Sequence, residues 1–281
     1  MQFRPRPLEG NVNVATTQPL VELAWLAGGL AGLLSVAYLL LGLAVDWVAP
    51  RVPYAMERSL GERLWPAPEG DPDPRRAEIQ MLLDRVSAAA PQEPGPVRLQ
   101  MVVSPTVNAA ALPGGRVLVF SGLLEQAESE NEVAMVLAHE LGHVVHRDPL
   151  RALGRGLVLA FLASSLVGEE RSVETFVGGS LTLGHLRYSR RQEQAADRFA
   201  VETLVALYGH AGGATALFQK IQVSGRDGHG PRALSTHPGS GARVAAIEAL
   251  IAEGAFPVSA PAPLPGHWGI PKPRAPKTEK E

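Results

Sequence analysis

The sequence predicts a mainly helical α+β protein with a small β-sheet and one N-terminal transmembrane helix. Three observations predict this class: a long uncharged stretch near the N-terminus, two short β-branched segments, and helical periodicity through most of the second half. The 281 residues are enough for one sizeable core. The absence of cysteine excludes disulfides and thiolate metal ligands, and the net charge of -2 gives no reason to expect a nucleic-acid partner.

The uncharged stretch covers residues 23–45 and is rich in Leu, Ala and Gly. At about 1.5 Å per residue it reaches roughly 34 Å, enough to cross a hydrocarbon core of about 30 Å. Trp25 and Trp47 lie near its ends, where indole rings prefer the membrane interface. We therefore predict a single-pass membrane anchor over residues 20–49, after an N-terminal tail of residues 1–19. A cleaved signal peptide and a buried core helix are the alternatives.

Arginines flank the predicted anchor on both sides. Two precede it and three follow it: Arg4 and Arg6, then Arg51, Arg58 and Arg63. The flank of a membrane span that carries more Lys and Arg tends to lie on the cytoplasmic side. A difference of one residue leaves undecided which side holds the C-terminal part of this chain.

Residues 50–75 are rich in proline and charge and are predicted to form a linker. At its end, Asp73 and Pro74 are typical of a helix N-cap followed by proline at the first helical position. Apolar residues at helical spacing then predict a helix that ends before Pro91. β-branched and apolar residues predict strands at 97–103 and 116–120.

The segment after these strands carries an H-E-x-x-H motif, made of His139, Glu140 and His143. Ser129 and Glu132 form a capping box that predicts the start of a helix just upstream. Residues four apart share one helix face, so both imidazoles can reach one metal ion. Glu140 follows the first histidine and can contact a metal-bound water, which is the arrangement that zinc hydrolysis needs.

A zinc hydrolase usually has a third protein ligand, and without cysteine it must be His, Asp or Glu. His146 is near in sequence, but one further turn carries it off the shared face. Glu193 is the better candidate, because a second capping box, S-x-x-Q at 189–192, starts another helix there. Glu193 and Asp197 share a face of that helix, so one carboxylate can bind zinc while the other orients a ligating histidine. The pattern leaves open that both acids only solvate an exposed face.

Two apolar segments, 156–167 and 173–183, follow the motif helix. Each is too short to span a bilayer by itself. They are expected to form a helical hairpin that covers the cleft or dips into the membrane surface, with a buried helix pair or a second span as alternatives. The Pro-rich and then charged tail, 257–281, is predicted to be disordered.

Four segments in order resemble the M48 family of gluzincin-type zinc metallopeptidases. They are NAAALPGGRVLVFSGLL at 108–124, AHELGHV at 138–144, YSRRQEQAAD at 188–197, and STHP at 235–238 followed by Arg243. Four ordered motifs are far more specific than H-E-x-x-H alone. One departure is that the family often has Arg-His shortly after the zinc helix, whereas this chain has His146-Arg147-Asp148.

The resemblance implies a zincin-like peptidase domain over residues 76–256 with one Zn²⁺ per chain. It assigns the zinc ligands His139, His143 and Glu193, the general base Glu140, the supporting acid Asp197, and His237 and Arg243 near the substrate or the oxyanion.

A polypeptide is the substrate that the resemblance implies, with protein quality control as the process. The extended segment 107–112 is expected to be an edge strand that pairs with a substrate backbone through Asn108, Ala109 and Ala110. An ordinary edge strand is the alternative. Two other functions remain open: a catalytically silent chaperone-like or scaffold protein that binds extended polypeptides, and a metallohydrolase acting on a lipid or cell-wall amide.

Overall fold

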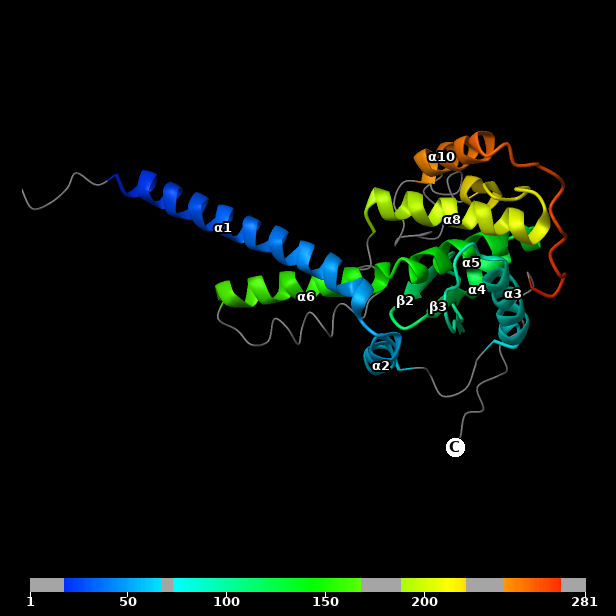
Figure 1. Ribbon diagram of the computed structural model, residues 1–281, viewed down its shortest axis with the longest axis horizontal. Helices are drawn as coiled ribbons and strands as arrows, with labels where there is room; N and C mark the ends of the chain where they lie inside the picture. The colour runs from blue at the N-terminus through cyan, green and yellow to red at the C-terminus, as the bar shows by residue number, and fades with distance from the viewer. Residues whose placement is uncertain (1–17, 67–72, 168–187, 221–239, 269–281) are drawn as a thin grey trace, which may run out of the picture.

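The computed structural model describes residues 18–66, 73–167, 188–220 and 240–268 (Figure 1). This part of the chain is mainly helical and contains a three-stranded sheet, which confirms the predicted fold class. The elements are α1 (Pro19–Val48), η1 (Ala49–Arg51), α2 (Tyr54–Leu64), α3 (Arg76–Ala89), β1 (Arg98–Val102), β2 (Ala109–Leu112), β3 (Arg116–Phe120), α4 (Ser121–Gln126), α5 (Glu130–Val145), α6 (Asp148–Val167), α8 (Arg190–Tyr208) and α10 (Ser240–Glu253).

Helix α1 extends away from the rest of the described chain (Figure 1). None of its side chains is buried, and its large apolar residues, such as Leu26 and Leu33, are mostly exposed. An apolar helix exposed along its whole length disagrees with the alternative of a buried core helix. Two helices in the described part are long and apolar enough to cross a membrane, 19–51 and 148–166.

Helix α6 leaves the globular part beside the end of α1 and runs back along it in the opposite direction (Figure 1). An ion pair joins the two helices, with Arg155 Nη2 2.5 Å from Asp46 Oδ2. Next to this pair, a Cβ on Gly154 would lie 2.7 Å from Val45 Cγ1. Glycine therefore permits the close approach of the two helices. The second apolar segment of the expected hairpin, 173–183, lies outside the described residues.

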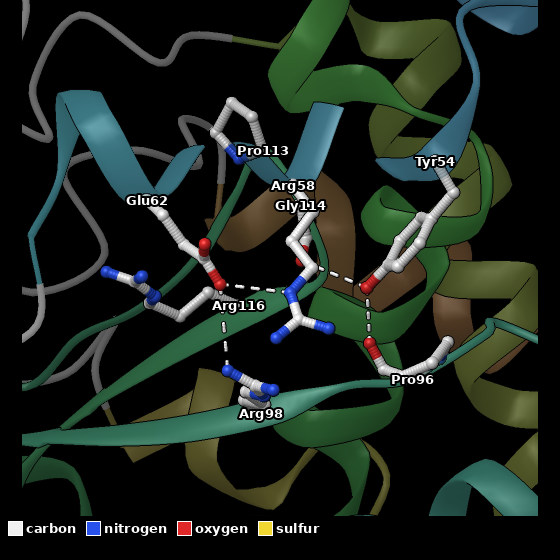
Figure 2. Close-up of a pocket in the computed structure, with 8 residues that line it drawn as sticks. All are labelled: Tyr54, Arg58, Glu62, Pro96, Arg98, Pro113, Gly114 and Arg116. Atoms are coloured by element: carbon white, nitrogen blue, oxygen red, sulfur yellow. Dashed lines mark hydrogen bonds and ion pairs between the residues drawn. The ribbon is translucent and has the colours of Figure 1, made fainter. Parts of the chain in front are cut away.

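The predicted linker contains a helix, α2, that the sequence analysis missed. α2 packs on the turn between β2 and β3, where the Tyr54 hydroxyl donates to Gly114 O at 3.0 Å and Glu57 Oε1 accepts from Gly114 N at 3.1 Å. Figure 2 shows the small cavity at this contact, where Arg58 bonds Glu62 within α2 and the sheet supplies two further arginines. Tertiary packing thus keeps a segment helical although its composition is typical of a linker.

The sheet has the strand order β1-β3-β2, with β1 parallel and β2 antiparallel to β3. The strands predicted at 97–103 and 116–120 correspond to β1 and β3. The segment expected to be an edge strand contains β2, which lies at one edge of the described sheet. All four β2 residues are buried, and the strand packs beside α5.

Helix α5 is the centre of the molecule. It is buried on every side, because α3, α8 and the sheet pack around it. Val133, Leu137 and Leu141 belong to one continuous apolar core that also includes Leu204 of α8 and Ile79 of α3. The motif helix is therefore held by close packing along most of its length.

The start of α3 differs slightly from the prediction. The helix begins at Arg76 rather than at Pro74. Asp73 Oδ1 accepts from Arg75 N at 3.0 Å, so Asp73 stabilises a turn that leads into the helix.

The prediction of a disordered tail is wrong for residues 257–268. Glu130 N donates to Ala262 O at 3.0 Å, and Ala262 N donates to Asn131 Oδ1 at 2.9 Å. Trp268 is only 3% exposed, and its Nε1 donates to Glu78 Oε2 at 2.8 Å. We call this segment, residues 257–268, the C-terminal strap. Proline has no N–H, so a Pro-rich segment has few backbone donors that need a hydrogen-bond partner when it packs against the helix ends. Residues 269–281 lie outside the described part.

Candidate active site

Two capped helices form the candidate site. At the start of α5, Ser129 Oγ accepts from Glu132 N at 3.3 Å, while Glu132 reaches back to Glu128 N rather than to Ser129 N. The capping box predicted at 189–192 has both of its bonds and starts α8. The caps fix where each helix begins, and so which residues face the neighbouring helix.

The side chains of His139, His143 and Glu193 converge in the interior between α5 and α8. One ligand atom from each lies within 4.8 Å of the others. The two Nε2 atoms are 3.1 Å apart, and Glu193 Oε2 and Oε1 lie 3.6 Å from His139 Nε2 and 3.8 Å from His143 Nε2. All three residues are buried. The structure thus brings together the three residues that were expected to bind a metal.

Each histidine places its other ring nitrogen against a carboxylate. His139 Nδ1 is 3.0 Å from Asp197 Oδ1, and His143 Nδ1 is 2.9 Å from Asp148 Oδ2. At His143 the carboxylate favours the tautomer in which Nδ1 carries the proton and Nε2 can bind a metal. At His139 the Arg243 guanidinium also contacts the ring, with Nη2 2.7 Å from Nδ1. The convergence of two imidazoles and one carboxylate in the protein interior is the donor arrangement of a metal site.

The spacing of these atoms also fits zinc. Tetrahedral zinc with bonds of about 2.0–2.1 Å keeps its ligand atoms roughly 3.3 Å apart. The two Nε2 atoms, 3.1 Å apart, are close to that value, and one Glu193 oxygen lies 3.6 Å from the first while the other lies 3.8 Å from the second. The donor set of two imidazoles and one carboxylate is one that catalytic zinc sites use, and the cluster fits one zinc ion.

Asp148 is a functional candidate that the sequence analysis missed. The sequence shows it only as part of the departure from the family pattern. The structure buries it at the first position of α6, where Gln192 Nε2 donates to its other oxygen at 2.6 Å. An acid five residues after a ligating histidine was the available signal, but the turn that points it back was not predictable.

Arg243 reaches the same cluster from α10. Its Nε lies 3.0 and 3.1 Å from the two oxygens of Asp197, and its Nη1 is 3.5 Å from Glu193 Oε2. Its Nη2 is 2.9 Å from His139 Nε2. Burial raises the pKa of the Asp197 carboxyl, and the Arg243 charge opposes this shift. The structure therefore places Arg243 against the ligand set, and its expected position near the substrate or the oxyanion stays a prediction.

Tyr188 and Glu140 complete the buried surroundings. The Tyr188 ring stacks on His143 with ring centroids 4.0 Å apart and an interplanar angle of 23°. Burial raises the pKa of Tyr188 well above its usual range, and the Glu140 charge adds to the shift. Glu140 itself is 1% exposed and follows His139 on α5, as the motif requires.

The other candidates lie apart from the cluster or outside the described residues. His146 ends α5 as its C-cap and contacts the Phe199 ring edge, and burial lowers its pKa. It is not one of the converging ligands. Asn108, Ala109 and Ala110 are buried at the start of β2, beside α5. His237 lies outside the described residues.

Comparison with known proteins agrees with this geometry. Residues 73–251 match Peptidase family M48. The chain is 29% identical over 198 residues to the mitochondrial metalloendopeptidase OMA1 of Schizosaccharomyces pombe, covering 69% of this chain and 57% of that protein. It is 31% identical over 173 residues to a putative beta-barrel assembly-enhancing protease of Vibrio cholerae, covering 57% of this chain and 36% of that protein. The mitochondrial metalloendopeptidase OMA1 of Arabidopsis thaliana is 34% identical over 139 residues, covering 49% of this chain and 28% of that protein. The chain thus spans less than two thirds of the length of each of these relatives.

Proposed function

The chain belongs to peptidase family M48, and from this membership we propose that it is a membrane-anchored zinc metalloendopeptidase that cuts polypeptides. The observation that carries the proposal is the convergence of two imidazole nitrogens and one carboxylate at a buried point next to Glu140. This donor set is the one that catalytic zinc sites use, and Glu140 lies beside it as the motif requires.

His139, His143 and Glu193 would hold the zinc ion in this proposal. When bound, zinc supplies a Lewis acid that polarises a carbonyl and lowers the pKa of water. Glu140 acts as general base, accepting a proton from the attacking water and returning it to the leaving amine. Arg243 favours the ionised form of Asp197 beside His139, because its guanidinium bonds both oxygens of that carboxylate. His237 remains a prediction of the family pattern, for stabilising the oxyanion.

Strand β2 is the proposed docking edge for the substrate backbone. It is an edge strand of the described sheet and lies beside the motif helix. An extended peptide that adds to such an edge is held by main-chain hydrogen bonds, which carry little sequence preference. Asn108, Ala109 and Ala110 are buried in the structure, so in this proposal the β2 edge must be uncovered before a substrate segment adds to it. Such an edge favours a peptide over a lipid substrate.

The membrane anchor is the second part of the proposal. Helix α1 is apolar, exposed and long enough to span a bilayer. Helix α6 packs against its C-terminal end. A cleaved signal peptide remains the competing interpretation. Because one relative is a putative beta-barrel assembly-enhancing protease, protein quality control is the process we propose.

The site is tested by measuring bound zinc and casein cleavage on the purified full chain. We expect about one zinc per chain and cleavage by the parent, and loss of both in Glu193→Ala. The matched control is Glu202→Ala, an acid of the same helix that is not in the cluster and should change neither. A parent that stays metal-free after zinc loading, or binds zinc without cutting, would favour the silent scaffold.

The anchor is tested on the same chain in cell membranes. We expect it to resist alkaline carbonate extraction and to keep the mass of the full sequence. Release by carbonate would disprove the anchor, and a mass that lacks the α1 residues would show that α1 is a signal peptide.

A further inference from the structure

We propose that Asp148 is a positioning residue that holds the zinc ligand His143 in its metal-binding tautomer and orientation. This inference rests on the proposed zinc site and adds a residue that the family pattern does not supply. The chain carries Arg147-Asp148 at the point where the family often has Arg-His.

Both oxygens of Asp148 are used in the structure. Oδ2 lies 2.9 Å from His143 Nδ1, and Oδ1 accepts from Gln192 Nε2 at 2.6 Å. Gln192 is itself fixed, because its Oε1 accepts from Ser189 N at 2.9 Å in the capping box of α8. Asp148 is 1% exposed, so water does not compete for these bonds. The carboxylate is therefore held between the two helices that carry the ligands.

The turn that delivers Asp148 is held from outside the site. Arg147 has a φ of 56°, a left-handed conformation that non-glycine residues rarely adopt. Its side chain donates to Ala49 O at 3.3 Å and to Val52 O, and lies 3.5 Å from Glu57 Oε2. These contacts, at the junction of α1 and α2, compensate for the strained backbone. The turn then points Asp148 back toward α5 as α6 begins.

The contact with Asp148 affects both the orientation of the His143 ring and the strength with which its other nitrogen binds a metal. A carboxylate on Nδ1–H makes the opposite nitrogen of an imidazole a better metal donor and stops the ring from rotating. Asp197 serves His139 in this way, so Asp148 gives the second ligand an equivalent partner. The start of α6 also favours a negative charge at Asp148, because the helix dipole is positive at its N-terminus.

The test compares zinc affinity, measured by chelator competition on the full chain, in Asp148→Ala and Asp148→Asn. Loss of such a partner typically weakens metal binding about 10–100-fold, which we expect for Asp148→Ala. The zinc affinity of Asp148→Asn should lie between those of Asp148→Ala and the parent, because an amide oxygen still accepts the hydrogen bond but carries no charge. The cobalt(II)-loaded variants should show a shifted visible absorption spectrum, a change that general destabilisation would not cause.

The matched control is Asp73→Asn, which neutralises another buried, ion-paired acid remote from the cluster and should leave zinc affinity unchanged. If Asp148→Ala does not fold, the near-isosteric Asp148→Asn decides. Parent-like zinc affinity and cobalt spectrum in a folded Asp148→Asn or Asp148→Ala would overturn the inference alone. Failure of the parent to bind zinc would instead refute the proposed function.

Discussion

Gly142 of α5 lies directly against Ala196 of α8. A Cβ added at Gly142 would be 3.1 Å from Ala196 Cα and 3.3 Å from Phe199 Cδ1. Glu193 lies one turn before Ala196 on the same helix, so this close approach sets how near the third ligand comes to the two histidines.

Replacing Gly142 should therefore loosen the site. Gly142→Val is expected to push α8 away from α5, costing about 1–3 kcal/mol of stability and weakening zinc binding. Gly142→Ala should show a smaller effect in the same direction. Gly266→Ala is the control, because a Cβ there meets nothing within 4 Å. Parent-like zinc affinity in Gly142→Val would mean that the helix contact does not position the ligand.

Glu140→Gln should separate metal binding from chemistry. The substitution keeps the size of the side chain but removes the proton acceptor, so zinc content should remain and casein cleavage should stop. Equilibrium zinc binding and cleavage rates on one preparation provide the measurement. Cleavage at the parent rate would exclude Glu140 as the base.

The pair formed by Arg243 and Asp197 should be strongly coupled. Both are buried, so Arg243→Met leaves an uncompensated charge and should cost about 3–5 kcal/mol in metal-free protein. Adding Asp197→Asn to that variant should recover part of the loss, which a double-mutant cycle from denaturant unfolding measures. Strictly additive effects would contradict the direct bidentate contact.

His146 should make the metal-free fold sensitive to acid. Burial lowers its pKa below the ordinary 6.5, so the folded state disfavours the protonated ring. The resulting loss in the free energy of unfolding is small above about pH 6.5 and grows as the pH falls, because the unfolded chain then binds the proton more readily than the folded protein does. His146→Gln should lose less stability than the parent between about pH 7.5 and 5.5. An equal loss in both proteins would assign the acid sensitivity to other groups.

The C-terminal strap should contribute to stability through Trp268. Trp268→Ala removes a buried indole and its bond to Glu78, and should cost about 3 kcal/mol in thermal or denaturant unfolding. The neighbouring His267 is largely exposed, so His267→Ala should cost far less. Equal effects would indicate that the strap frays before the domain unfolds.

Local rules were sufficient for the two histidine ligands and for the elements that carry the cluster, whereas Glu193 was assigned through the family resemblance. The four-residue spacing of His139 and His143 puts them on one face of any α-helix, and the caps at Ser129 and Ser189 start their helices where the pattern predicts. The apolar run of α1 and the strands β1 and β3 follow from composition and periodicity in the same way. These features depend on residues within a few positions of each other, so a single sequence determines them.

Contacts between distant segments decided the rest. The helix at 54–64 is held by the β2–β3 turn, and the strap at 257–268 is held by α5 and α3, although their composition predicted a linker and disorder. The partners of the two ligating histidines likewise come from other elements. Asp148 reaches His143 only because a left-handed turn at Arg147 reverses the chain, and Arg243 reaches Asp197 from a helix 46 residues away. No local rule encodes such pairings, because they arise only when the helices pack around α5.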